Sequence, residues 1–394
     1  MKVLLKELGE IITGNTPSKK TEEFWNSEDI CFVKPDIIAG NGVNEIMDSN
    51  EYISEEARKK ARVVGKNSIF ITCIGSIGKI GIASDGEYAF NQQINAIIPN
   101  DRVQAKYLAY NLLFNKPRLV AIANAPVVPI INKGQFGEFT VNVETDIDRQ
   151  SEIVDVLDKL TQIIQQRNKE ISALDNLIKA RFVEMFGDPV ANPFDWPVKR
   201  LAEISLLITN GNTPKGGSEN YVDKGIMFLR SQNVWRNRID LDDVAYIDEA
   251  THSAMKKSSV HDRDILITKT GRINTENSSL GRAALFRGKD NSANINGHVY
   301  LVRLDGETIP EYVVSILTSE SYRRYIRRVC VGGIDKRQIN LDQVEDFPII
   351  TPPKAMQQQF AAFVAQIDKS KATVQKALDE TQLLFDSLMQ QYFG

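Results

Sequence analysis

The chain has 394 residues, 42% of them hydrophobic and 25% charged, which is typical of a globular protein and excludes disordered, collagenous and fibrous classes. At roughly 100–200 residues per domain, this length predicts two or three domains. The net charge of −3 excludes a histone-like protein that coats nucleic acid without sequence preference, because such proteins are clearly basic.

The location of the protein is suggested by its cysteines and its apolar segments. Cys31, Cys73 and Cys330 are scattered and form neither a zinc pattern nor a disulfide framework. No apolar run reaches the roughly 18–20 residues that span a bilayer, and the N-terminus lacks the apolar core of a signal peptide. We therefore expect a cytoplasmic protein.

Four short motifs occur twice in the same order, which predicts an internal duplication. The spacing between copies rises from 196 to 207 residues, as loop insertions in the second copy would produce. One insertion is visible between Gly271 and Gly281, where the first copy has the compact Gly75-Ser76-Ile77-Gly78. The pairs are Gly14–Pro17 with Gly211–Pro214, Ile69–Thr72 with Ile265–Thr268, Ile131–Gln135 with Ile334–Gln338, and Met185–Gly187 with Tyr392–Gly394.

Each copy begins with a domain of short strands, over residues 1–146 and again over 190–350. β-Branched and aromatic runs bounded by turn residues predict the strands, and short helical stretches lie between them. Examples are Ser68–Thr72 and Ile94–Ile98 in the first copy, and Asp264–Thr268 and His298–Arg303 in the second. This pattern predicts an α+β fold with a mixed sheet and short helices rather than a regular βαβ alternation.

Each domain is followed by a long helix, predicted over residues 147–189 and 351–394. Apolar residues recur at alternating spacings of four and three, the signature of a coiled-coil seam. We take Arg167 and Lys371 as corresponding polar interruptions that discourage register slips. The seam positions are Ile153, Leu157, Leu160, Ile164, Arg167, Ile171, Leu174 and Ile178 in the first helix, and Phe360, Val364, Ile367, Lys371, Val374, Leu378, Phe385, Leu388 and Tyr392 in the second.

The shared heptad phase favours pairing of the two helices with each other. An antiparallel coiled coil would separate the two domains along a rod of about 60 Å. The alternative is two amphipathic helices that pack on separate domains. Aromatic residues at the helix ends, including Phe182, Phe186 and Phe393, fit core packing, with docking of a partner as the second interpretation.

No catalytic constellation is recognisable in the sequence. Gly75-Ser76-Ile77-Gly78-Lys79 lacks the glycine spacing and the Ser or Thr after lysine that a phosphate loop requires. His252, His261 and His298 have no metal-ligand spacing. The sequence therefore indicates a binding and scaffolding protein rather than an enzyme, without metal or catalytic residues.

The duplicated order of domain and heptad helix resembles the DNA-specificity (S) subunits of type I restriction–modification systems. The likeness rests on Gly14–Pro17 and Gly211–Pro214, on Gly75–Gly78 with Asn91-Gln92, and on the helix end Ile178–Pro189, and it covers essentially the whole chain. The second copy departs in detail, because Asn294-Ile295-Asn296 stands where the first has Asn91-Gln92-Gln93.

This resemblance implies that each domain is a target-recognition domain that reads one half of a bipartite, asymmetric site on double-stranded DNA. The helices would set the gap between the half-sites and dock two methyltransferase (M) subunits, which restriction–translocase (R) subunits would join. S-adenosylmethionine, ATP and Mg²⁺ would belong to those partners and not to this chain. The alternative is a coiled-coil assembly protein without sequence-specific DNA binding.

Candidate DNA contacts are chosen by residue type and loop position, since Lys and Arg contact phosphates while Gln, Asn and bidentate Arg read bases. In the first domain they are Lys19, Lys20, Lys34, Ser76, Lys79, Gln92, Gln93, Lys133 and Gln135. In the second they are Lys215, Arg230, Gln232, Arg236, Lys269, Arg272, Arg282, Asn296, Arg323, Arg324, Arg327, Arg328, Lys336, Arg337 and Gln338.

The two domains differ in the kind of basic residue they use. The second has fourteen Arg among 22 basic residues, whereas the first has four among 16. Because Arg prefers bidentate contact with guanine, we expect more directly read G·C pairs in the second half-site. Net charges are −2 for residues 1–146 and +1 for 190–350, so neither domain binds DNA by its overall field alone.

Overall fold

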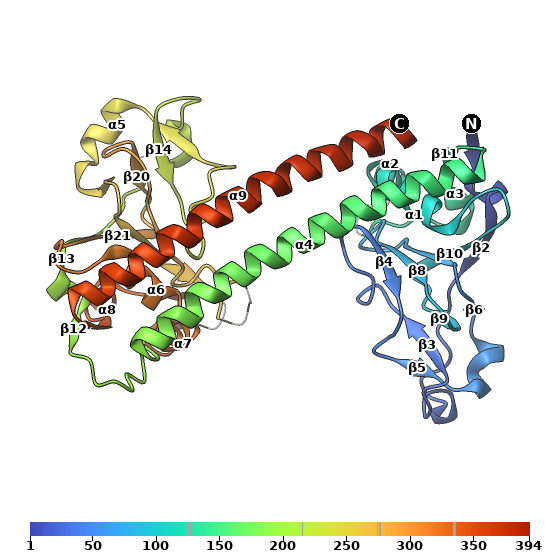
Figure 1. The fold of residues 1–394 in the computed structure, drawn as a ribbon, viewed down its shortest axis with the longest axis horizontal. Helices are drawn as coiled ribbons and strands as arrows, with labels where there is room; N and C mark the ends of the chain where they lie inside the picture. Colours follow the sequence, from blue (N-terminus) through green and yellow to red (C-terminus); the bar gives the residue numbers. More distant parts are fainter. Residues whose placement is uncertain (124–127, 215, 274, 276, 334–335) are drawn as a thin grey trace. The chain divides into compact units, whose positions relative to one another are not determined.

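The computed structural model describes residues 1–123, 128–214, 216–273, 275, 277–333 and 336–394. The chain divides into two compact units. Unit 1 comprises Met1–Lys169 with Val374–Gly394, and unit 2 comprises Glu170–Thr373. Each unit contains one α+β domain together with a segment of each of the two long helices (Figure 1).

Unit 1 is built on two main sheets, beside the two-stranded pair β1-β11. The five-stranded sheet has the order β2-β10-β7-β8-β4 and is antiparallel except where β4 pairs with β8; the four-stranded sheet has the order β5-β3-β9-β6, with β3 and β9 parallel. The strands are β1 Lys2–Leu4, β2 Gly9–Thr13, β3 Ile30–Val33, β4 Val43–Ile46, β5 Tyr52–Ile53, β6 Val63–Val64, β7 Ile69–Thr72, β8 Ile80–Ala83, β9 Tyr88–Phe90, β10 Ile94–Pro99 and β11 Thr140–Asn142. The short helices are α1 Ala105–Phe114, α2 Lys116–Ile122 and α3 Lys133–Gly137.

Unit 2 repeats this plan. Its two main sheets run β13-β21-β17-β19 and β15-β14-β20-β16, beside the smaller β12-β24 and β18-β23-β22. Strands β14 and β20 are parallel as β3 and β9 are, so the duplication predicted from the motifs is confirmed. The strands are β12 Val198–Arg200, β13 Ser205–Asn210, β14 Ile226–Leu229, β15 Ala245–Ile247, β16 Ser259–Val260, β17 Ile265–Thr268, β18 Thr270–Gly271, β19 Ala283–Leu285, β20 Ala293–Ile295, β21 Val299–Leu304, β22 Val331–Gly333, β23 Lys336–Gln338 and β24 Pro348–Ile350. The short helices are α5 Glu249–Ala254, α6 Pro310–Thr318, α7 Glu320–Val329 and α8 Leu341–Glu345.

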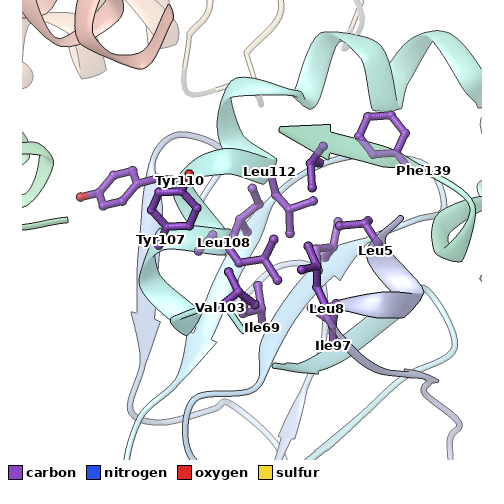
Figure 2. Close-up of a cluster of buried hydrophobic side chains, with 14 of the residues drawn as sticks. Leu5, Leu8, Ile69, Ile97, Val103, Tyr107, Leu108, Tyr110, Leu112 and Phe139 are labelled. Atoms are coloured by element: carbon purple, nitrogen blue, oxygen red, sulfur yellow. The ribbon is translucent and has the colours of Figure 1, made fainter. Parts of the chain in front are cut away.

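The main core of unit 1 lies between the five-stranded sheet and α1 (Figure 2). Leu108 and Leu112 of α1 are fully buried with Leu8 and Ile97 of the sheet side. Burial of such side chains, at about 1.5–3 kcal/mol each, is the dominant stabilisation of the domain. The corresponding core of unit 2 contains Tyr312 of α6 together with buried side chains of β17 and β21.

The two long helices are α4 (Ile147–Phe186) and α9 (Lys354–Phe393). Gly187 ends α4 with a φ of +75°, a left-handed conformation that glycine adopts without steric cost. The start of α4 and the end of α9 share the core of unit 1, through Leu157 and Phe393, whereas the end of α4 and the start of α9 share that of unit 2. This arrangement requires antiparallel helices.

Every predicted seam residue is buried or half-buried, while most residues between them are exposed. One correspondence expected from the sequence is wrong. At the helix offset of 207 residues, Arg167 corresponds to Val374 and Lys371 to Ile164, so the two basic interruptions are not equivalent. Lys371 forms an ion pair with Asp175, whereas the shielded Nε of Arg167 has no hydrogen-bond partner among the described residues.

A buried glutamine anchors the first turn of each long helix. Gln150 Oε1 accepts from the backbone N–H of Gln104 (2.8 Å), and Gln357 Oε1 accepts from that of Ile309 (3.0 Å). Both amides also donate to a carbonyl just before their own helix. Each long helix is thus fixed to the domain that precedes it, by a contact that the heptad pattern did not indicate.

Candidate nucleic-acid interface

Two equivalent glycines set the geometry of one candidate loop in each domain. Gly14 donates its N–H to Ile94 O (3.0 Å), and Gly211 donates to Val299 O (3.1 Å). A Cβ on Gly14 would lie 2.2 Å from Asn91 O, and one on Gly211 would lie 2.0 Å from Ile295 O. The repeated motif therefore requires glycine because the chain passes directly over the turn that connects two strands.

That turn corrects the correspondence expected from the sequence. Asn91 Oδ1 accepts from Gln93 N (3.1 Å), and Asn296 Oδ1 accepts from His298 N (3.0 Å). The equivalent of Asn91-Gln92-Gln93 is therefore Asn296-Gly297-His298 and not Asn294-Ile295-Asn296. Asn294 lies in β20, buried, with its side-chain oxygen bonded to Ser258. His298, which was not among the candidates, takes the place of Gln93.

A second pair of equivalent loops follows β7 and β17. Lys79 N donates to Thr72 Oγ1 (3.0 Å), and Arg282 N donates to Thr268 Oγ1 (2.9 Å). Lys79 and Arg282 therefore occupy equivalent positions in the two domains. Gly78 and Gly281 precede them with φ values of +76° and +64°. The loop in the second domain is longer, and residues 274 and 276 within it lie outside the described residues.

The repeat assigned to Ile334–Gln338 is also wrong. Asn132 and Gln135 cap α3 with a reciprocal pair of hydrogen bonds. At α8, Asn340 N donates to Gln343 Oε1 (2.8 Å) as Asn132 N does to Gln135 Oε1 (3.0 Å). This shared hydrogen bond identifies Ile339-Asn340 as the equivalent of Ile131-Asn132. Lys336, Arg337 and Gln338 instead form β23, in a three-stranded sheet with β18 and β22.

One backbone junction joins three candidate loops in each domain. In the first, Cys73 N donates to Gln93 O (2.8 Å) and Cys73 O accepts from Ile131 N (2.9 Å). In the second, Lys269 makes the same two bonds with His298 and Ile339, at 2.8 and 3.0 Å. The junction therefore brings together the loops that carry Ser76, Gln92, Gln93 and Lys133 in the first domain and Lys269, Arg272, Asn296 and Gln338 in the second.

Several candidates in the first domain make contacts within that domain, and others are exposed. Lys34 and Lys19 both pair with Glu51, and the hydrogen bond from Lys34 holds the pKa of that carboxyl below its usual value. Lys19 also lies 5.1 Å from the ring centroid of Trp25. Lys79 donates to Pro35 O (2.8 Å). Lys20 and Gln135 are exposed; Gln92 is exposed and accepts from the Thr16 hydroxyl (2.8 Å).

Several candidates of the second domain are occupied by internal contacts. Arg230 and Gln232 both bond to Asp243, and Arg337 donates to Cys330 O (3.3 Å). Lys269 lies 5.7 Å from the ring centroid of Tyr300. Arg272 and Lys336 are exposed, and Lys215 lies outside the described residues.

Arg282 is buried, with 8% of its surface exposed. Its Nε donates to Ser278 O (3.0 Å), and its guanidinium carbon lies 3.8 Å from the ring centroid of Trp235. Burial, together with the nearby charges of Arg236 and Arg238, lowers its pKa. Arg282 therefore holds loops in place instead of reaching into solvent.

The arginines of α7 face two directions. Arg323 pairs with Glu320 (2.7 Å), and its pKa is lowered by burial and by nearby Arg236. Arg324, Arg327 and Arg328 line a hollow with Asp188 and Ser321. Burial would raise the pKa of Asp188, but the hydrogen bond from Ala191 N–H and the charge of Arg324 contribute to a net lowering.

The stretches of chain that the structure describes bear on metal binding and on membrane insertion. Within these stretches, no group of three or more His, Cys, Asp or Glu side chains is arranged to hold a metal ion. None of the helices there is both long and apolar enough to cross a bilayer.

Known proteins are similar to this chain over most of its length. A family model described as "Type I restriction modification DNA specificity domain" matches residues 1–173 and 193–381. The MjaIX specificity subunit of Methanocaldococcus jannaschii is 24% identical over 409 residues, covering 98% of this chain and 90% of that protein. The HindI specificity subunit of Haemophilus influenzae is 28% identical over 205 residues, covering 52% and 39%.

The fold is also found among solved structures. The crystal structure of a type I restriction–modification S subunit from M. genitalium superposes with a TM-score of 0.58 at 15% identity, covering 100% of this chain and 96% of that one. A chain from a structure described as the basis of complex assembly and conformational transition of the type I system superposes with a TM-score of 0.56, also at 15% identity. At these identities the likeness concerns the fold.

Proposed function

The chain belongs to the type I restriction–modification DNA specificity family, and from this membership we propose that each of its two domains reads one half of a bipartite DNA site. The family match does not support the alternative of an assembly protein without sequence-specific DNA binding. We further propose that the chain itself is non-catalytic and works in the cytoplasm.

The observation that carries the proposal is the duplicated backbone junction. The same hydrogen bonds hold Cys73 in the first domain and Lys269 in the second, but the side chains around them differ. Gln92 and Gln93 in one domain are replaced by Gly297 and His298 in the other. The two domains share this backbone arrangement but present different side chains. This difference supports two half-sites of different sequence, since base edges are distinguished by the side chains presented to them.

The long helices supply the second part of the proposal. Each is fixed by a buried glutamine to the domain that precedes it, so the helices can set the spacing between the half-sites. We propose that they dock two methyltransferase subunits and that restriction–translocase subunits join this core. S-adenosylmethionine, ATP and Mg²⁺ would be bound by those partners.

A domain exchange tests the function. Residues 190–350 are replaced by the equivalent region of another specificity subunit, and the methylated sequence is determined for the assembled methyltransferase. We expect one half of the sequence to change while the other half and the spacer stay the same. The reciprocal exchange of residues 1–146 is the control and should change the opposite half. A change in both halves, or in neither, would contradict the proposal.

A further inference from the structure

A tight turn in the second domain presents two arginines from a rigid base. We call residues 235–238, with the sequence Trp235-Arg236-Asn237-Arg238, the Trp–Arg turn. A β-bridge between Val234 and Ile239 closes it, and Trp235 N donates to Arg238 O (2.9 Å). Asn237 N donates to Ala283 O (2.9 Å), and the hydroxyl of Thr318 donates to Asn237 Oδ1 (3.2 Å).

Arg282 covers one face of the Trp235 ring. The guanidinium of Arg282 lies 3.8 Å from the indole centroid, while its Nε is bonded to Ser278 O. The guanidinium of Arg238 lies 5.3 Å from the same centroid. A planar cation over an indole is attracted by the ring quadrupole, so these contacts reduce the freedom of the turn.

Positive charge accumulates around the turn. Arg236 and Arg238 are exposed, and the charge of Arg236 is felt both by Arg282 and by Arg323 of α7, where it contributes to the lowering of each pKa. Carboxylates also lie within the group: Asp240 is 3.7 Å from Arg238, and Glu320 is 2.7 Å from Arg323. Clustered charges of one sign attract a polyanion.

The first domain has no Trp–Arg turn at the equivalent position of its sequence. Val33 of β3 and Leu229 of β14 occupy the same position in their sheets, beside Phe90 and Ile295. Counting from them, the Trp–Arg turn corresponds to residues 39–42, Ala-Gly-Asn-Gly, which contain neither a basic nor an aromatic side chain. Lys79, the equivalent of Arg282, donates there to a backbone carbonyl, Pro35 O.

We propose that the Trp–Arg turn reads guanine in the half-site of the second domain through the guanidinium groups of Arg236 and Arg238, an inference that rests on the proposed function. A guanidinium donates two parallel hydrogen bonds to O6 and N7 of guanine in the major groove. Preorganisation of the turn reduces the conformational entropy lost when these bonds form. Trp235 and Arg282 act as positioning residues.

The test separates base reading from phosphate contact by exchanging arginine for lysine. Lysine keeps the charge for a phosphate but loses the fork that matches guanine. The full chain with R236K, R238K, or both, is assembled with its methyltransferase subunits and selected against a random DNA library. R200Q is the matched control, because Arg200 is an exposed arginine of the same domain that pairs with Glu203 and Asp346.

We expect the lysine variants to lose preference for G at one or two positions of a single half-site, by roughly 5- to 150-fold each. Binding of the library as a whole should change little, and R200Q should keep the wild-type sequence. A second pair, R236Q and R238Q, should lose the same positions and, in addition, general affinity. Assembly with the methyltransferase subunits, followed by gel filtration, checks that each variant is folded.

Two outcomes would overturn the inference. One is that the lysine variants keep the wild-type sequence while the glutamine variants weaken all DNA sequences equally and flatten the salt dependence, which would make the turn a phosphate contact. The other is relaxed preference in both half-sites. Failure of the proposed function looks different, because then the wild-type and R200Q complexes would themselves select no bipartite sequence, and the inference would fall with it.

Discussion

Lys371 of α9 forms an ion pair with Asp175 of α4 at a seam position where the other helix carries Ile164. The Lys371 side chain retains 26% of its exposure and that of Asp175 47%. An ion pair this exposed contributes at most about 1 kcal/mol, since solvent screens it. The neighbouring seam residues are apolar, so the position favours an apolar side chain.

Lys371→Ile should therefore raise the free energy of unfolding, by about 1 kcal/mol, because burial of the side chain outweighs the lost pair. Urea denaturation of the full chain measures this change. Asp175→Asn is the control that removes the pair while keeping Lys371, and it should lower stability slightly. If Lys371→Ile is as destabilising as Lys371→Ala, the seam at this point is not apolar.

Gly14→Ala and Gly211→Ala should destabilise their domains, by about 3 kcal/mol each, because the new methyl group would overlap a backbone carbonyl. Gly40→Ala and Gly333→Ala are matched controls in the same two domains, since a Cβ at either position meets no atom within 4 Å. Hydrogen exchange resolved by segment locates the loss. Equal effects at the test and control positions would count against the close approach.

The repeat was predictable from the sequence where the backbone restricts residue type. Gly14 and Gly211 recur because only glycine fits over the turn, and the seam recurs because heptads leave a 3.5-residue period. The match of Ile131–Gln135 to Ile334–Gln338 failed because it rested on residue identity. The feature that recurs is the hydrogen-bonded start of a short helix, formed in the first domain by Asn132 and Gln135. In the second domain Asn340 N donates to Gln343 Oε1 (2.8 Å), and Gln343 lies four residues before the buried Phe347.

The reading residues were less predictable than the fold. Side-chain type placed Arg282 among the DNA contacts, but burial against Trp235 gives it a supporting position. His298 was overlooked because the alignment of the turn was shifted by two residues. The burial of Gln150 and Gln357 could not be predicted from the heptad pattern, because a hydrophobic periodicity does not indicate a single buried polar residue in a helix.

Gln150→Leu should destabilise the junction between α4 and its domain. The substitution leaves the backbone N–H of Gln104 and a carbonyl at Glu144 without their partner, and each unsatisfied group costs about 1–3 kcal/mol. Denaturant unfolding measures the loss, and Gln357→Leu should cause a similar one in unit 2. Exposed Gln165→Leu, on the same helix, is the control and should change stability little.

Glu311 makes unit 2 sensitive to acid. Burial would raise the pKa of this carboxyl, but its hydrogen bond to Arg263 (2.6 Å) and the charge of Arg287 hold it below its usual 4.5. Because the folded pKa lies below the unfolded one, the stabilisation is present above pH 4.5 and is lost as the pH falls through the folded value. Glu311→Gln should therefore lower stability at neutral pH and flatten its decline in acid.

Unfolding free energy measured against pH tests this expectation. Glu307→Gln is the control, since the Glu307 side chain is 80% exposed and pairs with Lys354 at the surface, so the free energy of unfolding should change little. If the free energy of unfolding of Glu311→Gln falls in acid as steeply as that of the unaltered chain, Glu311 does not contribute to the acid sensitivity.

The isolated chain should bind DNA weakly, and methyltransferase subunits should raise its affinity substantially. The two domains carry net charges of −2 and +1, so basic residues are gathered in local clusters and the overall field supplies little attraction. Binding assays at several salt concentrations, with and without the partner subunits, measure this. The complex should show the steeper salt dependence, because partner lysines and arginines add phosphate contacts. Tight, sequence-specific binding by the chain alone at physiological salt would contradict the expectation that the methyltransferase subunits supply much of the affinity.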